Sequence, residues 1–101
     1  MRQRHAVTDL ASIPPGSGQA FTIAGRRIAL FNVDGKIHAM DDVCPHAGAP
    51  LSEGRLNGCV ITCPWHGWSF DVTTGRMPGM DQDCQAVHSV IINGDQVEVE
   101  V

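Results

Sequence analysis

Residues 44–48 read Cys44-Pro45-His46-Ala47-Gly48, and residues 63–67 read Cys63-Pro64-Trp65-His66-Gly67. Each segment holds one cysteine, a proline directly after it, one histidine, and a glycine one or two positions further on. Proline stiffens a loop, and glycine lets the backbone approach a bound group closely. Two such loops can converge and supply two thiolates and two imidazoles. The pattern C-x-H-x16-C-x-x-H therefore predicts a metal centre, with Cys and His as the ligand types.

Short apolar runs alternate with turn signals on both sides of these segments. Ala24-Gly25, Asp34-Gly35 and Asn93-Gly94 are typical of hairpin turns, because glycine supplies the positive φ that such turns need. Strands are predicted over residues 21–23, 27–33, 36–40, 87–92 and 96–101, and one short helical turn over residues 8–12. This pattern predicts an all-β fold, a small antiparallel sandwich or barrel, with residues 1–101 as a single domain.

Residues 41–84 differ in composition from the rest of the chain. They hold all four cysteines (Cys44, Cys59, Cys63 and Cys84), both tryptophans and four of the six prolines. Such a stretch is typical of loops carried on a β scaffold, where functional residues are concentrated.

The whole chain has 101 residues and a formal net charge of −4. Negative charge argues against nucleic-acid binding, and no apolar run is long enough to span a membrane. No apolar stretch follows the two N-terminal arginines, so we expect no secretory signal and a cytoplasmic location. In that compartment clustered Cys and His favour a metal site over a disulfide framework.

The two segments together resemble the motif of Rieske-type [2Fe–2S] proteins. The resemblance implies a Rieske fold with a two-loop cluster-binding subdomain over about residues 41–84, and one cluster per chain. It further implies that Cys44 and Cys63 bind one iron and that His46 and His66 bind the other. A structural zinc held by the same four residues is an alternative, although zinc sites usually pair Cys with Cys and His with His.

Length and ligand pattern separate the branches of that family. The membrane-anchored branch carries an extra disulfide, whose positions are occupied here by Ala49 and Trp65. The chain has no room for an oxygenase domain, so it is expected to be an electron-transfer component and no enzyme. It is most similar to the small soluble ferredoxins, which implies a flavin-dependent NAD(P)H reductase and a terminal oxygenase as partners. The small subunit of an assimilatory nitrite reductase is an alternative.

The resemblance also bears on the reduction potential. High-potential members place a serine and a tyrosine two and four residues after the second histidine, where their hydroxyls stabilise the reduced cluster. Those positions hold Trp68 and Phe70 here, and Ser69 is expected to face the other way. The expected potential is therefore near the low end of the Rieske range, on the order of −150 mV.

The remaining notable residues receive simpler interpretations. Cys59 is predicted to be a buried thiol in an apolar strand and Cys84 a thiol in a polar loop, while His5, His38 and His88 are predicted to be structural or surface residues. Trp68 is expected to pack, whereas Trp65 is either buried or exposed at a docking face. Residues 77–80, Met77-Pro78-Gly79-Met80, resemble a third loop that covers the cluster. Six acidic residues are either solvated or steer docking: Asp41, Asp42, Glu53, Asp71, Asp81 and Asp83.

Overall fold

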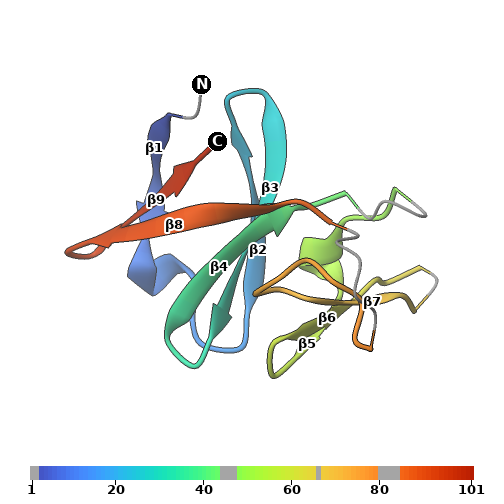
Figure 1. The fold of residues 1–101 in the computed structure, drawn as a ribbon. Helices are drawn as coiled ribbons and strands as arrows, with labels where there is room; N and C mark the ends of the chain where they lie inside the picture. The colour runs from blue at the N-terminus through green and yellow to red at the C-terminus, as the bar shows by residue number, and fades with distance from the viewer. Residues whose placement is uncertain (1–2, 44–47, 66, 80–84) are drawn as a thin grey trace.

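The computed structural model describes residues 3–43, 48–65, 67–79 and 85–101. Strands dominate these ranges, with two 3-10 turns between them (Figure 1). In chain order the elements are β1 (Arg4–Asp9), η1 (Leu10–Ser12), β2 (Gly18–Ile23), β3 (Arg26–Val33), β4 (Lys36–Asp41), η2 (Leu51–Glu53), β5 (Arg55–Asn57), β6 (Val60–Thr62), β7 (Ser69–Asp71), β8 (Val87–Asn93) and β9 (Gln96–Glu100).

The main sheet has six antiparallel strands in the order β1-β9-β8-β4-β3-β2. Its two edge strands, β1 and β2, approach each other without pairing, so the sheet curls into a nearly closed barrel. The all-β antiparallel fold predicted from the sequence is confirmed.

The predicted hairpin turns are also confirmed. Ile23 pairs with Arg26 across Ala24-Gly25, and both turn residues have positive φ, 52° and 79°. Asp34 and Gly35 form the equivalent turn between β3 and β4, with φ of 53° and 92°. Two consecutive positive φ angles match the right-handed twist of the flanking strands, which is why such short loops connect hairpins.

Two apolar clusters form the core, and strand β3 contributes to both. Ile28 and Leu30 on one face of β3 belong to the cluster inside the barrel, with Ile13, Ile37, Val97 and Val99. Ala29 and Phe31 on the other face belong to a second cluster outside the barrel. Alternation along residues 27–33 predicts these two faces, with Ile28 and Leu30 on one and Ala29, Phe31 and Val33 on the other. The structure buries each face in a different cluster.

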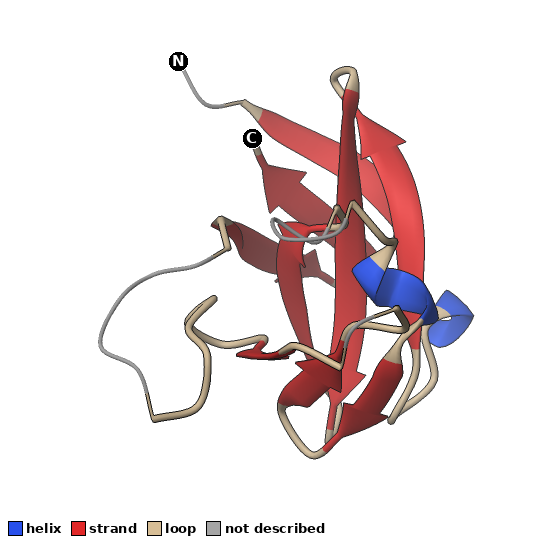
Figure 2. Ribbon diagram, turned by 90° about the vertical axis from the view of Figure 1, so that its right-hand side faces the viewer, coloured by secondary structure: helices blue, strands red, loops and turns tan. Residues whose placement is uncertain are grey.

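Residues 42–79, which we call the loop subdomain, carry a small sheet of their own. Strands β5, β6 and β7 pair in that order, antiparallel, and η2 precedes them. Figure 2 shows this small sheet and its connecting loops beside the main sheet. The sequence predicted mainly loops here, with short apolar runs of strand around Cys59 and at Ser69, and that prediction was incomplete. Strands of three residues are too short for an alternating pattern to be recognised.

The sequence pattern did not predict strand β1, for a related reason. Its half-buried positions include His5 and Val7, so it lacks a clear apolar face. It pairs with β9, where Arg4 lies 3.7 Å from Glu98. Because Glu98 alternates with Val97 and Val99, the sequence predicts it on a solvent-exposed face of β9, but Glu98 is buried beside β1 and Arg4. The structure therefore corrects the expected exposure of this face.

Candidate metal centre

The first ligand loop leaves the end of β4 and returns at η2. Val43 and Pro50 form an isolated antiparallel bridge, and the amide of Leu51 donates to the carbonyl of Asp42 over 2.6 Å. These contacts close the base of the loop. The predicted ligands Cys44 and His46 lie within it, outside the described residues.

Asp42 anchors the base of this loop although its side chain is fully buried, at 0% exposure. Its two carboxylate oxygens each accept a hydrogen bond over 2.8 Å, one from Arg27 Nε and one from the amide of Ser52. A buried carboxylate is tolerated only when it is paired and hydrogen-bonded. Asp42 thus ties the end of the β3–β4 hairpin to η2.

Gln85 joins a third segment to the same base. Its side-chain Nε2 donates to the carbonyls of Asp41 and Val43 over 2.8 and 2.6 Å. Its own amide donates to the carbonyl of Gly75 over 3.0 Å. A Cβ on Gly75 would lie 2.1 Å from the carbonyl oxygen of Gln85, so this close approach requires glycine. The turn before residues 77–80 is thereby fixed to the first ligand loop.

The second ligand loop connects β6 and β7. The amide of Cys63 donates to the carbonyl of Trp68 over 2.6 Å, and the amide of Gly67 donates back to the carbonyl of Cys63 over 3.3 Å. Gly67 has a φ of +71°, which a side chain would strain. Cys63 points inward with 2% exposure, whereas Trp65 points outward with 64%. His66 lies outside the described residues.

Apolar packing brings the two loops together. Ala49 from the first loop and Cys63 from the second belong to one buried cluster, which also holds Leu51, Ile61 and Phe70. Gly54 lies directly after η2, and a Cβ there would lie 2.0 Å from the carbonyl oxygen of Thr62. The absence of a side chain at Gly54 allows η2 and β6 to approach this closely. The convergence expected from the sequence is therefore confirmed at the described parts of both loops.

The donor set fits a mixed thiolate and imidazole centre. Cys63 is a thiol at the wall of a hollow that it shares with Gly54, Thr62 and Pro64, so its surroundings are accessible from outside. Elsewhere in the described ranges no group of three or more His, Cys, Asp or Glu side chains is placed to hold a metal ion. The described residues thus offer no metal site that competes with the four predicted ligands.

Cys59 differs from its prediction. It lies in the turn before β6, half-buried, and its thiol donates a hydrogen bond to Asp71. Burial works to raise the pKa of Asp71, but hydrogen bonds from Thr73 and from Cys59 outweigh it and hold the pKa below its usual value. Cys84 lies outside the described residues.

The three remaining histidines lie in strands, of which those of His38 and His88 were predicted. His5 is on β1, and His88 on β8 places its Nε2 2.8 Å from Asp41 Oδ1. His38 on β4 is half-buried, and burial lowers its pKa. The positive charge of Lys36 lowers that pKa further, while the carboxylate of Asp71 opposes the shift.

The third loop follows β7. The amide of Asp71 donates to the carbonyl of Arg76 over 2.7 Å, and Met77 packs against the cluster that contains Cys63. Pro78 is exposed, and Met80 lies outside the described residues. The described part of this loop therefore lies against the core beside the second ligand loop.

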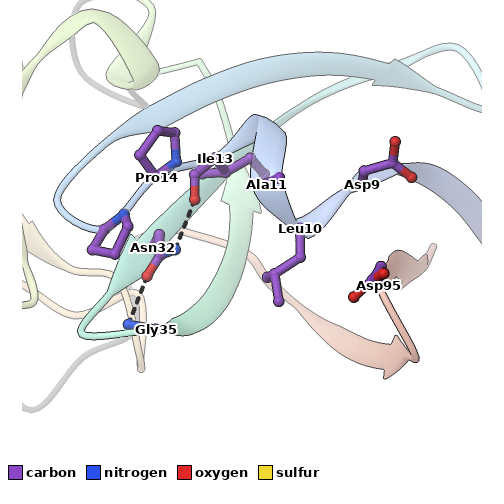
Figure 3. Close-up of a pocket in the computed structure, with 9 residues that line it drawn as sticks. Asp9, Leu10, Ala11, Ile13, Pro14, Asn32, Gly35 and Asp95 are labelled. Carbon is purple, nitrogen blue, oxygen red and sulfur yellow. Dashed lines mark hydrogen bonds between the residues drawn. The ribbon is translucent and has the colours of Figure 1, made fainter.

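A separate hollow lies at the other end of β4 (Figure 3). It is lined by Leu10, Ile13, Asp95 and Asn32, and the Asn32 side chain donates to the carbonyl of Ile13 and accepts from the amide of Gly35. Strand β4 runs from Lys36 to Asp41 between this hollow and the ligand loops. This position separates the hollow from the candidate metal centre. The helices in the described ranges have neither the length nor the apolar character that a membrane crossing requires.

Comparisons with known proteins show which proteins this chain resembles. The family model of the Rieske [2Fe-2S] domain matches residues 3–91. The ferredoxin component of the naphthalene 1,2-dioxygenase system of Pseudomonas aeruginosa is 45% identical over 67 residues. This match covers 66% of the chain and 64% of that relative, which is less than two thirds of the relative's length.

Solved structures give a similar result over more of the chain. A structure of the complex of reduced oxygenase and oxidized ferredoxin in carbazole 1,9a-dioxygenase contains a similar chain, with a TM-score of 0.84 and 33% identity, covering 95% of this chain and 91% of that one. The putative small subunit of an NADPH nitrite reductase superimposes with a TM-score of 0.82 at 24% identity, covering 96% and 97%. At that identity the second likeness shows a common fold.

Proposed function

This chain belongs to the Rieske [2Fe–2S] domain family, and we propose that it is a one-electron carrier between a flavin-dependent NAD(P)H reductase and a terminal oxygenase. The observation that carries the proposal is the convergence of the two ligand loops on one buried cluster, through Ala49 and Cys63. The similar dioxygenase ferredoxins support the assignment to an electron-transfer component with no catalytic site of its own.

The ligand set is part of the proposal. Cys44 and Cys63 hold one iron and His46 and His66 hold the other, in one cluster per chain. The cluster supplies reversible one-electron chemistry when bound. The inward position of Cys63 and the closed base of the first loop support this set.

The chain's own residues fix the loops and limit the entry of water. Asp42 and Gln85 hold the base of the first loop, and the backbone bonds of Cys63 hold the second. Rigid loops keep the ligand geometry the same in both redox states, which reduces the reorganisation that accompanies electron transfer. Phe70 and Val72 pack behind Cys63 and are fully or almost fully buried, so the inner side of the site is apolar.

We include residues 1–101 as one domain in this proposal, since β3 supplies side chains to both apolar clusters. We also propose a cytoplasmic location, because the reductase would draw its electrons from NAD(P)H. The alternative role as a nitrite reductase small subunit rests on a likeness of fold and has no further support in the described residues.

Metal analysis and electron transfer test the proposal. The purified protein should be red-brown and contain about two irons and two acid-labile sulfides per chain, as the cluster formula requires. A flavin reductase with NAD(P)H should reduce it, and the reduced form should pass electrons to a terminal oxygenase. Stoichiometric zinc without sulfide would instead support the structural zinc alternative and refute the electron-carrier role.

A further inference from the structure

The hollow at the far end of β4, which we call the distal hollow, has a volume of about 740 Å³ (Figure 3). It is formed by η1 with the loop that follows it, the β3–β4 turn and the β8–β9 turn. The six residues of β4, about 20 Å of extended chain, separate it from the ligand loops. A peptide segment seated in the distal hollow therefore leaves the ligand loops uncovered.

The floor of the distal hollow is apolar. Ile13 is fully buried at its base, and Leu10 packs half-buried against the same barrel cluster. Pro14 and Pro15 extend the apolar surface to the exposed edge. An apolar side chain placed on this floor gains free energy, because its burial removes apolar surface from water.

Hydrogen bonds fix the three segments that form the distal hollow. The Asn32 side chain donates to the carbonyl of Ile13 and accepts from the amide of Gly35, each over 2.7 Å. The amide of Leu10 donates to the carbonyl of Asp95, also over 2.7 Å. The hollow is thus formed before any ligand enters, and a preformed site loses little conformational entropy on binding.

Two exposed carboxylates stand at the rim. Figure 3 shows Asp9 and Asp95 on one side of Leu10. Asp9 pairs in register with Gln96, the neighbour of Asp95, so the two acidic residues lie on adjacent strands. Asp9 precedes η1 without capping it, and in the described ranges neither carboxylate has an ion pair or a side-chain hydrogen bond. The rim therefore offers two negative charges that are available to a cation.

The acidic residues that the sequence offered for docking differ from this pair. Asp41 and Asp42 bind arginines, and Asp71 accepts local hydrogen bonds. Asp81 and Asp83 lie outside the described residues. The described carboxylates near the ligand loops are thus mostly engaged, whereas those at the distal hollow are not.

Lys36 does not neutralise the rim, although it directly follows Gly35 in the chain. Its neighbour Ile37 points into the barrel cluster, so Lys36 and His38 lie on the outer face of β4. The charge of Lys36 accordingly acts on His38 and lowers the pKa of that histidine.

We propose that the distal hollow binds a basic segment of a protein partner, in which a large apolar side chain stands next to a lysine or arginine. The apolar side chain covers Leu10 and Ile13, and the cation lies between the carboxylates of Asp9 and Asp95. The site is far from the ligand loops, so this inference does not rest on the proposed function.

The exposed rim favours a protein segment over a small ligand. Asp9, Pro14, Pro15 and Asp95 are all exposed, so a small molecule in the hollow would remain largely in water, whereas small-molecule sites enclose most of the ligand. A segment carried on a larger surface covers the rim as it binds and excludes water from the ion pairs. Negative charge at the rim repels nucleic acid and anionic lipid surfaces.

The first experiment titrates isotope-labelled holoprotein with the peptide acetyl-Gly-Leu-Lys-Leu-Lys-Gly-amide and follows amide signals by NMR. We expect the signals of Leu10, Gly35 and Gln96 to shift, because these residues line or adjoin the hollow. Replacing both lysines of the peptide with glutamate, or both leucines with serine, should weaken binding about ten-fold or more.

Variants of the chain locate the binding. Asp9→Asn or Asp95→Asn should raise the Kd about five-fold, the effect of losing one partly exposed ion pair. Glu53→Gln is the matched control, because it removes the same charge from an exposed position beside the second ligand loop and should leave the Kd unchanged. Ala11→Lys places a positive charge in an exposed part of the lining, so it should abolish binding without altering the core.

Four outcomes would overturn the proposal. They are no binding of the leucine–lysine peptide, equal Kd values for Asp95→Asn and Glu53→Gln, undiminished binding to Ala11→Lys, and equal binding of the serine peptide. Octylamine that binds as tightly as the peptide would assign the hollow to small amines and overturn the choice of a protein segment.

The second experiment tests the location. The interfacial electron-transfer rate of the holoprotein at an electrode is measured with and without saturating peptide. We expect the same rate in both conditions, because a peptide in the distal hollow leaves the ligand loops uncovered. A rate that falls as the peptide binds would place the peptide at the ligand loops and overturn the assignment to the distal hollow.

Discussion

The six-stranded sheet and the loop subdomain are held together by different kinds of contact. In the sheet, backbone ladders and two-residue turns fix the strands, and apolar side chains such as Ile28 and Val97 pack inside the barrel. In the loop subdomain, a buried carboxylate, an amide side chain and a closely approached glycine join separate segments: Asp42, Gln85 and Gly54.

This difference shows that the loop subdomain depends on more specific contacts than the main sheet does. Ladders and apolar packing tolerate many sequences, whereas a buried carboxylate requires partners at defined distances. The main sheet supplies a general scaffold, and the loop subdomain uses specific polar contacts to hold ligand loops that contain little regular structure. Substitutions in the two regions should therefore differ in their effects.

The largest effect should come from the proposed ligands. Replacing Cys44, His46, Cys63 or His66 with Ala should abolish the visible absorption and lower the Tm sharply, because metal binding contributes folding energy in small metallodomains. Iron and sulfide analysis measures the loss of the cluster, and thermal unfolding measures the change in Tm. Cys59→Ser and Cys84→Ser are the controls, and a colourless Cys84→Ser protein would show that the ligand set is wrong.

Asp42→Asn should have the next largest effect. It removes a buried charge that accepts bonds from Arg27 and from the amide of Ser52, at a cost of about 2 kcal/mol. Thermal unfolding of the holoprotein measures this loss of stability. Asp34→Asn is matched in chemistry but lies in an exposed turn of the main sheet with positive φ, where Asn is well tolerated. Equal losses in both variants would contradict the special role of Asp42.

Gly54→Ala and Gly18→Ala compare the two regions at positions where a Cβ would collide. At Gly54 it meets the carbonyl oxygen of Thr62 at 2.0 Å, and at Gly18 it meets the ring of Phe31 at 2.5 Å. A backbone atom yields less than a side chain, so we expect a loss of about 2 kcal/mol at Gly54 and a smaller one at Gly18. The order of the two Tm values checks this, and the reverse order would count against a rigid link between η2 and β6.

Phe70→Tyr should change the potential more than the stability. Phe70 is buried in the cluster that contains Cys63, while Ser69 bonds Thr62 on the other side of the strand. A hydroxyl on the ring that bonds the ligand sulfur should raise the potential by about 40 mV, the equivalent of about 1 kcal/mol for one electron.

Voltammetry of wild type and variant measures this shift. Phe21→Tyr is the control, because Phe21 packs against the barrel cluster and should leave the potential unmoved. A wild-type potential well above zero would refute the low-potential assignment.

The smallest effect concerns His38 and Asp71, one from each region. The pKa of His38 is lowered, so the unfolded chain binds its proton more readily than the folded one does. The stability from His38 is present above pH 6.5 and is lost as the pH falls through its folded pKa. The pKa of Asp71 is also lowered. The stability that Asp71 contributes is therefore present above pH 3.8 and is lost as the pH falls through its folded pKa. His38→Gln should flatten the first decline in Tm, and an identical pH profile would show that His38 contributes nothing.

Local chemistry made much of the fold predictable. Positive φ at Ala24-Gly25 and Asp34-Gly35 follows from the turn residues themselves, and the two faces of β3 follow from alternation along Ile28 to Val33. The four ligands were proposed because Cys, Pro, His and Gly recur at matched spacing. Strands β1 and β5 escaped prediction, and the bounds of β6 and β7 were not predicted, because their pairing partners compensate for weak patterns of their own.

The sequence by itself determined the β class, the hairpins of the main sheet and the two ligand segments, since each depends on residues close together in the chain. Only the tertiary structure decided the roles of the acidic residues. Asp42 meets Arg27 across 15 positions, and Gln85 meets Val43 across 42. It also decided that Cys63 faces the core while Trp65 faces outward. Such roles depend on which segments pack together, because burial and pairing are properties of neighbours in space and no local pattern contains them.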